Sequence, residues 1–237
     1  MRPELDFKYA GMKEVIEFLS ELKDNNNREW FEANRSRYAG VKKVFDAFAT
    51  ELIAHIGAFD PSTAGLGLKD CTYRIYRDTR FSHDKTPYKT HMGVYVCRGG
   101  KKSGYAGYYF HVEPGTDGRA AHGLMSAGLY MPEGNVLKSM REEIYDNGAA
   151  LEADVCAAGG FALDTSNKLK RLPAGYPADA PHGELLKQKD LYLVKYFDEA
   201  WLLQKELAAA AAREFERTLP FVLRLNRAVE YAHEEME

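Results

Sequence analysis

The spacing of apolar residues changes near Lys69, and this change constrains the fold more than any other feature. Before Lys69, apolar residues recur every three or four positions, as in helices; after it they alternate with polar residues, as in strands. The first pattern predicts helices over about 12–22 and 28–55. The polar run 24–27 ends the first helix and offers Asn27 as the N-cap of the second, so the two should form an antiparallel hairpin.

The alternating pattern predicts a sheet. The glycine-rich run 98–104 joins two of its strands and has the composition of a hairpin connection, so those strands should be antiparallel neighbours. In each strand the apolar set should face the helices. The predicted strands cover residues 71–76, 91–97, 107–113, 121–131 and 191–197.

The remaining segments are predicted to be helical or irregular. Proline, glycine and short polar runs make 161–181 irregular, with one short strand at 168–172. Asp198 is a good cap for an alanine-rich helix that reaches Arg217. The other predicted helices cover about 133–145, 151–157, 182–187 and the residues after Pro220.

This order of helices, antiparallel strands and helices predicts a single α+β domain over residues 1–237. The sheet should be mostly antiparallel, packed with the N-terminal helical hairpin and the C-terminal helices. Regular alternation of strands and helices is absent, which argues against a dinucleotide-binding fold.

Composition and missing motifs exclude several classes of protein. No run approaches the roughly 20 apolar residues of a membrane helix, so a soluble, cytoplasmic protein is expected. The three cysteines are far apart in the sequence and are expected to be small core residues. Neither a metal-binding motif nor a phosphate-binding loop is present, so we expect no metal and no cofactor.

A basic segment extends from Arg74 to His91, with five Arg or Lys residues against two Asp residues in a chain of formal net charge −3. Arginine suits oxyanions because its planar fork donates two parallel hydrogen bonds, and lysine adds a point charge. The same residues could instead clamp neighbouring carboxylates and hold a loop. The candidate anion-binding residues are Arg74, Arg77, Arg80, Lys85 and Lys89.

Strand alternation collects polar and aromatic residues on the sheet face opposite the helices, because successive side chains point to opposite sides. On this face Tyr76, Tyr95 and Tyr109 are predicted to contact a ligand beside Arg74. The candidates for proton transfer are His91, His111 and Asp78. The alternative is structural: such residues also cover a sheet beneath a second helical layer.

Several motifs resemble those of a widespread family of conserved hypothetical proteins from bacteria and fungi. They are NNNREWFEANRSRY (25–38), YRIYRDTRFSHDKTPYKTH (73–91), GYYFHVEP (107–114) and GLYMP (128–132). The family has no established activity, so the resemblance implies signature positions and no reaction. These positions are Asn26, Arg28, Trp30, Phe31, Arg77, Asp78, Arg80, Phe81, Asp84, Lys85, Pro87, Tyr88 and Lys89.

Three functions are compatible with these patterns. The favoured one is binding of, or enzymatic action on, a phosphorylated or carboxylated small molecule at the basic segment and the Arg/Tyr/His face. The second is a nucleic-acid-binding module, which the acidic remainder of the chain disfavours. The third is a scaffold for a protein partner, in which the basic segment locks the helical hairpin to the sheet.

Overall fold

The computed structural model describes residues 10–80, 82–115 and 121–234, and it contains a five-stranded antiparallel sheet combined with helices. The α+β prediction is therefore confirmed. The strands lie side by side in the order β1, β2, β3, β5, β4. Their bounds are β1 Met92–Cys97, β2 Gly107–Val112, β3 Ala121–Leu129, β4 Ala162–Leu163 and β5 Leu191–Asp198.

The helices come mainly before and after the first three strands. Asn27 caps the second of them as predicted, since its side-chain oxygen accepts a hydrogen bond from the Trp30 amide at 2.9 Å. A short 3₁₀ helix, Pro61–Thr63, follows the third. The α-helices are α1 Ala10–Asp24, α2 Arg28–Ala33, α3 Arg35–Phe59, α4 Leu68–Cys71, α5 Gly134–Ala157, α6 Gly183–Leu186, α7 Glu199–Leu202, α8 Leu207–Glu216 and α9 Leu219–Glu234.

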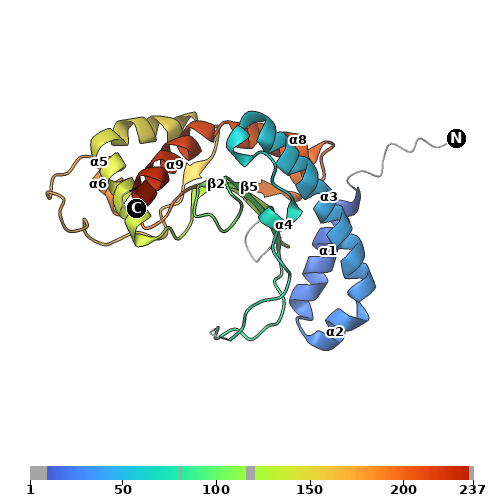
Figure 1. Ribbon diagram of the computed structural model, residues 1–237. Helices are drawn as coiled ribbons and strands as arrows, with labels where there is room; N and C mark the ends of the chain where they lie inside the picture. Colours follow the sequence, from blue (N-terminus) through green and yellow to red (C-terminus); the bar gives the residue numbers. More distant parts are fainter. Residues whose placement is uncertain (1–9, 81, 116–120, 235–237) are drawn as a thin grey trace.

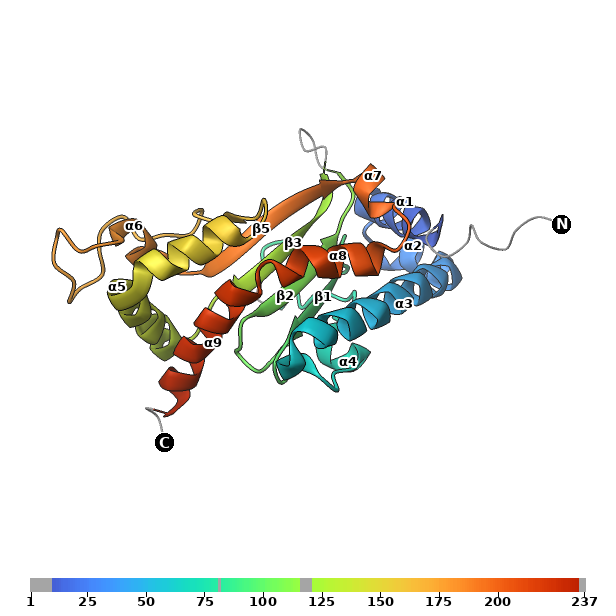
Figure 2. The same ribbon diagram turned by 90° about the horizontal axis from the view of Figure 1, so that it is seen from above.

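The long helices cover one face of the sheet. Figure 1 shows α3, α8 and α9 on this side, and Figure 2 shows them from above, lying over β1, β2 and β3. Helix α1 packs against α3, and α5 packs against α9. No helix in the described part of the chain lies across the opposite face (Figure 1). None of the described helices is long and apolar enough to cross a membrane.

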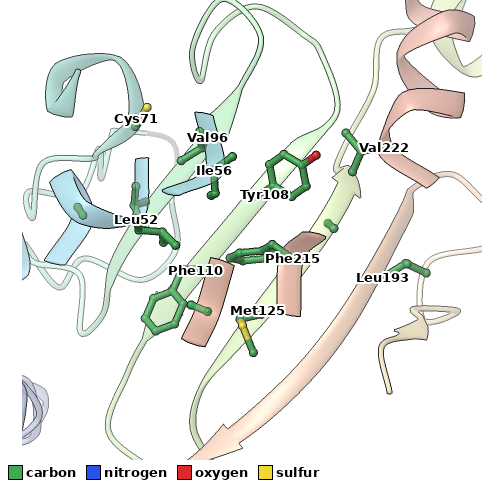
Figure 3. Close-up of a cluster of buried hydrophobic side chains, with 14 of the residues drawn as sticks. Leu52, Ile56, Cys71, Val96, Tyr108, Phe110, Met125, Leu193, Phe215 and Val222 are labelled. Atoms are coloured by element: carbon green, nitrogen blue, oxygen red, sulfur yellow. The ribbon is translucent and has the colours of Figure 1, made fainter. Parts of the chain in front are cut away.

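The hydrophobic core lies between the sheet and these helices (Figure 3). Val94, Phe110 and Met125 are paired across the first three strands and are fully buried. Tyr108 is also buried, and its hydroxyl donates to Asp60 Oδ2 at 3.0 Å, so its polar atom is satisfied inside the core. Alternate residues of β1, β2 and β3 thus point into the helical layer.

The predicted strand at 71–76 is wrong, because these residues form the end of α4 and then an extended segment with isolated bridges only. The Asp70 side chain accepts a hydrogen bond from the Gly67 amide, and the Thr72 hydroxyl donates to the Leu68 carbonyl, so local bonds close a helical turn here. The alternation also fails at Tyr73, which is exposed instead of buried.

Several helix boundaries differ from the prediction. The helix expected over 28–55 is divided at Asn34, whose φ and ψ of −107° and 14° are not helical. The helices expected at 133–145 and 151–157 form one helix, α5, with a kink at Asn147. Asp198 does cap a helix, but Glu206 has a left-handed φ of 57° and separates α7 from α8. The expected strand at 168–172 is reduced to a single bridge of Lys168.

The cysteines only partly match the prediction. Cys71 and Cys97 are buried, as expected of small core residues, whereas Cys156 is exposed on α5. Burial raises the pKa of the Cys71 thiol to about 12, so this group is an inert core residue near neutral pH.

The segment 74–91 docks on the N-terminal helical hairpin (Figure 1). The Asn26 amide donates to the Tyr88 carbonyl at 2.9 Å and accepts from the Tyr88 amide at 3.1 Å, so it pairs with this residue as a neighbouring strand would. The Phe31 ring stacks on the Tyr88 ring with centroids 4.0 Å apart. Two of the signature motifs therefore contact each other. Phe81 lies outside the described residues.

We predict that Asn26→Ala lowers the free energy of unfolding by about 1–3 kcal/mol, because it leaves two backbone groups of Tyr88 without a partner. Urea denaturation followed by circular dichroism measures the change. Asn25→Ala is the matched control, since the side chain of this exposed neighbour donates to the preceding turn at the Glu21 carbonyl. Equal loss of stability in both variants would contradict the docking role of Asn26.

Candidate functional site

The uncovered face of the sheet carries polar and aromatic residues of β1, β2, β3 and β5. Tyr95 of β1 lies opposite Tyr109 of β2, and Tyr109 lies opposite Ser126 of β3. The Tyr95 hydroxyl donates to the Tyr105 carbonyl at 2.8 Å, which ties the β1–β2 connection to the sheet. On the far side, β5 adds Tyr192 and alternate residues after it.

A cavity of about 680 Å³ lies over this face, within the size range of small-molecule sites. It extends from β1 across β3 to β5 and is bordered by the β1–β2 connection and the start of α5. Tyrosine is the residue type that recurs most often in its wall. The tyrosines that line it are Tyr73, Tyr95, Tyr105, Tyr109, Tyr130, Tyr192 and Tyr196.

Three lysines line the cavity on the β1 side. Lys89 lies just before β1, with its ammonium group 5.1 Å from the centre of the Tyr73 ring. Lys101 and Lys102 belong to the β1–β2 connection, and Lys101 donates to the Lys69 carbonyl. Within the described ranges, Lys89 and Lys102 have no carboxylate at ion-pair distance. Burial and the nearby Arg74 lower the pKa of Lys89, so this site disfavours an unaccompanied positive charge.

The other basic residues of segment 74–91 are arranged differently. Arg77 is paired with Asp84, Arg80 with Asp78, and the Lys85 ammonium group donates to a backbone carbonyl of the same loop. None of these three cations lines the cavity. These contacts of the three cations join residues of the same loop.

Arg74, Tyr76 and Asp78 lie away from the sheet-face cavity. Arg74 lines a smaller cavity of about 260 Å³ between α3 and β1, which Lys89 and His91 also line. The Tyr76 ring packs near Phe31. Asp78 is exposed, and its hydrogen bonds with Arg80 lower its pKa to about 2, so it is a poor proton carrier near neutral pH. The structure does not bring Asp78 near the histidines that were predicted with it.

The two candidate histidines do lie together. The rings of His91 and His111 are stacked, with centroids 4.5 Å apart. Tyr109 Oη lies 3.0 Å from His111 Nδ1, and Glu113 Oε2 lies 3.3 Å from His111 Nε2 without hydrogen-bond geometry. Burial raises the pKa of Tyr109, so its hydroxyl keeps its proton near neutral pH and donates to Nδ1 in the His111 tautomer that carries its proton on Nε2. His91 and Tyr109 line the cavity, whereas His111 is buried behind them.

This arrangement depends on the absence of a side chain at Gly93. A Cβ at this position would lie 2.6 Å from Tyr109 Oη, closer than any real contact of this kind. Gly93 is directly opposite His111 in the antiparallel pair. The Tyr109 ring lies over Gly93, and its hydroxyl contacts the His111 imidazole. Gly93 therefore decides where the Tyr109 hydroxyl is placed.

Sequence analysis missed several cavity residues. Tyr73 belongs to the apolar set of the predicted strand 71–76, which should face the helices, and Lys101 and Lys102 lie in the glycine-rich run that was predicted only as a hairpin connection. Ser126 and Tyr192 alternate with core residues of predicted strands, so extending the two-residue period to β3 and β5 would have found them. Nothing in the local sequence indicates that the β1–β2 connection borders the cavity.

We predict that Gly93→Ala lowers the free energy of unfolding by about 1–3 kcal/mol, because the new methyl group must displace the Tyr109 ring. Guanidinium denaturation measures the loss. Gly134→Ala, at a position with open space around the new methyl group, is the control and should be close to neutral. A neutral Gly93→Ala variant would show that Tyr109 does not need this position.

We also predict a histidine contribution to acid sensitivity. Burial, with smaller effects of His111 and Lys89, lowers the pKa of His91 from 6.5 to about 4. Between these values the unfolded chain binds a proton at His91 that the folded chain does not, so stability falls as pH decreases from about 6.5 to about 4. His91→Gln should reduce this slope in denaturation curves measured across the window. If the stability of the variant and of the wild type changed with pH to the same extent, this prediction would be wrong.

Comparison with known proteins identifies the family of the chain. No group of three His, Cys, Asp or Glu side chains in the described part is placed to hold a metal ion. No curated protein and no solved structure matches the chain. Residues 14–223 match the model of a family described as "Conserved hypothetical protein (DUF2461)", a description that names no activity. The matched range spans the four motif segments, 25–38, 73–91, 107–114 and 128–132, and nearly all of the cavity lining, and the chain belongs to this family of conserved hypothetical proteins.

Proposed function

We propose that the protein binds an anionic small molecule, phosphorylated or carboxylated, in the cavity over the uncovered sheet face. The observation that carries the proposal is the meeting of Lys89 and Lys102, which lack carboxylate partners in the described residues, with tyrosine hydroxyls in a cavity of ligand size. Lys89 is half-buried whereas Lys102 is exposed, and a half-buried ammonium group without a counter-ion is unfavourable, which favours a bound anion beside Lys89.

Lys89 is the main anion contact in this proposal. Its pKa is lowered by burial and by Arg74, and a bound anion would offset both effects because it favours the protonated amine. The Lys89 amide donates to the Ile75 carbonyl at 2.8 Å, so the backbone that carries the side chain is fixed before a ligand arrives. Pre-organisation of this kind lowers the entropic cost of binding.

The basic segment therefore contributes in two ways. Arg77, Arg80 and Lys85 shape the loop through contacts within it, and Lys89 reaches the ligand. Enzymatic action on the anion would use the groups on the cavity wall. A ligand hydroxyl beside Tyr109 Oη would donate its proton there while Tyr109 passes its own to His111 Nδ1, with the Glu113 carboxylate stabilising the imidazolium.

The experiment is a thermal-shift screen of phosphates and carboxylates, followed by calorimetric titration of each compound that stabilises the protein. We predict that Lys89→Ala weakens binding of these compounds by roughly 10- to 100-fold, the usual effect of losing a hydrogen bond to a charged group. Lys85→Ala is the control, since this lysine belongs to the same loop, donates to the Thr79 carbonyl and does not line the cavity.

Two results would overturn the proposal. One is a wild-type protein that no anion in the screen stabilises. The other is a Lys89→Ala variant that binds every anion as the wild type does. Equal loss in Lys89→Ala and Lys85→Ala would instead move the anion from the cavity to the loop, which also contradicts the proposed site.

A scaffold role is the second candidate, and the docking of segment 74–91 on the helical hairpin favours it. The Asn26 pairing and the stacked Phe31 and Tyr88 rings give two signature motifs a structural purpose. In that case Arg77→Ala would lower the melting temperature while Lys89→Ala would change neither stability nor anion binding.

A further inference from the structure

We infer that the anion bound by this protein is a phosphoryl group, and that it occupies the smaller cavity between α3 and β1, which Arg74 and Lys89 both line. The inference rests on the proposed function, in which Lys89 is the main anion contact. It narrows the ligand class to a phosphate monoester, with its organic part over the sheet face. It also gives Arg74 a ligand contact of its own.

The smaller cavity has an excess of positive charge. Among the described residues of its wall the only carboxylate is Asp46, which is paired with Lys42. The cations that remain in the wall are Lys69, Arg74 and Lys89. In the part of the chain that the structure describes, none of these three has a carboxylate at ion-pair distance. A wall with this balance of charge favours an occupant with more than one negative charge.

Arg74 and Lys89 lie close enough for their charges to interact. Burial and then the positive charge of Arg74 lower the pKa of Lys89. Two like charges in one cavity wall repel each other, and an anion that contacts both removes this cost. Asp78 is not that anion, because its pKa is lowered mainly by hydrogen bonds with Arg80 and least by Arg74.

The chemistry of these two cations favours a phosphoryl group over a carboxylate. The planar guanidinium group of arginine donates two parallel hydrogen bonds to one anion, and the ammonium group of lysine adds a point charge. A phosphate monoester has three terminal oxygens and about two negative charges near neutral pH, so it can bind both groups at once. A carboxylate has a single charge and leaves much of the positive charge of the wall unbalanced.

The backbone that carries Arg74 is fixed beside β1 before a ligand arrives. On one side of it Thr72 forms a bridge with Val94 of β1. On the other side the Ile75 carbonyl accepts a hydrogen bond from the Lys89 amide at 2.8 Å. The two cations therefore come from backbone segments that are already paired, which lowers the entropic cost of binding an anion.

The size of the smaller cavity determines which part of the ligand it can hold. Its volume is about 260 Å³, below the roughly 300–1,000 Å³ of sites that hold a whole small molecule. It suits the charged group of a ligand. The two cavities adjoin, because Tyr73, Lys89, His91 and Tyr109 line both of them. The organic part of the ligand can therefore extend from Lys89 along the sheet face toward Tyr109.

The test compares probes that share an organic part and differ in the anionic group. The pairs are glycerol 3-phosphate with glycerate, phenyl phosphate with benzoate, and methyl phosphate with acetate. Calorimetric titration should give at least one pair in which the phosphate binds about tenfold more tightly, the effect of one further hydrogen bond between charged groups. Arg74→Ala should weaken binding of that phosphate by roughly 10- to 100-fold. Arg74→Lys should recover part of the loss, since it restores the charge without the planar fork.

The control is Arg80→Ala, since this arginine belongs to the same segment and lines neither cavity. Because Arg74 is exposed, its replacement should not prevent folding, which circular dichroism checks. Equal affinities within every pair would overturn the assignment of a phosphoryl group. An Arg74→Ala variant that binds phosphates as the wild type does, or equal losses in Arg74→Ala and Arg80→Ala, would overturn its place in the smaller cavity. In these cases Lys89→Ala still decides the proposed function, whereas a wild type that binds no probe contradicts both.

Discussion

The burial of one face of the sheet is the constraint on which the rest of the structure depends. Val94, Phe110 and Met125 pack under α3, α8 and α9, and this packing sets the side of the sheet to which every other residue points. A strand that buries Phe110 must place Tyr109 and His111 on the opposite face. The same alternation of side chains therefore determines both the residues of the core and the strand residues of the cavity wall.

Charge pairing divides the basic segment into cations that pair within the loop and a lysine that faces the cavity. Arginines 77 and 80 have carboxylate partners within the loop, and such exposed pairs contribute little free energy by themselves. Their value is geometric, since they shape a loop that Asn26 joins to the helical hairpin. Lys89, at the end of the same loop, has an aromatic neighbour and faces the cavity, which makes it the residue through which loop and site are connected.

The periodicity of apolar residues predicted which helices and strands exist better than it predicted the residues at which they begin and end. It located β1, β2, β3 and β5, because a long run of alternating apolar and polar residues can bury its apolar side chains only as a strand with that face toward the core. It failed at 71–76, where local hydrogen bonds of Asp70 and Thr72 form a helical turn despite the alternation. Part of the site could be predicted for the same reason. The alternation of side chains along a strand places Tyr95, Tyr109 and the paired histidines on the uncovered face, but it does not predict that Lys101, Tyr130 and Met131 line the cavity.

The sequence by itself determined the α+β class, the antiparallel strands and the two-sided character of the sheet, since these follow from the period of apolar residues. The tertiary structure decided which cations are paired, that Tyr73 lines a cavity, and that a buried Asp190 holds Met131 outward. These contacts join residues from separate elements or depend on local backbone angles, and their distances are set only when the elements pack.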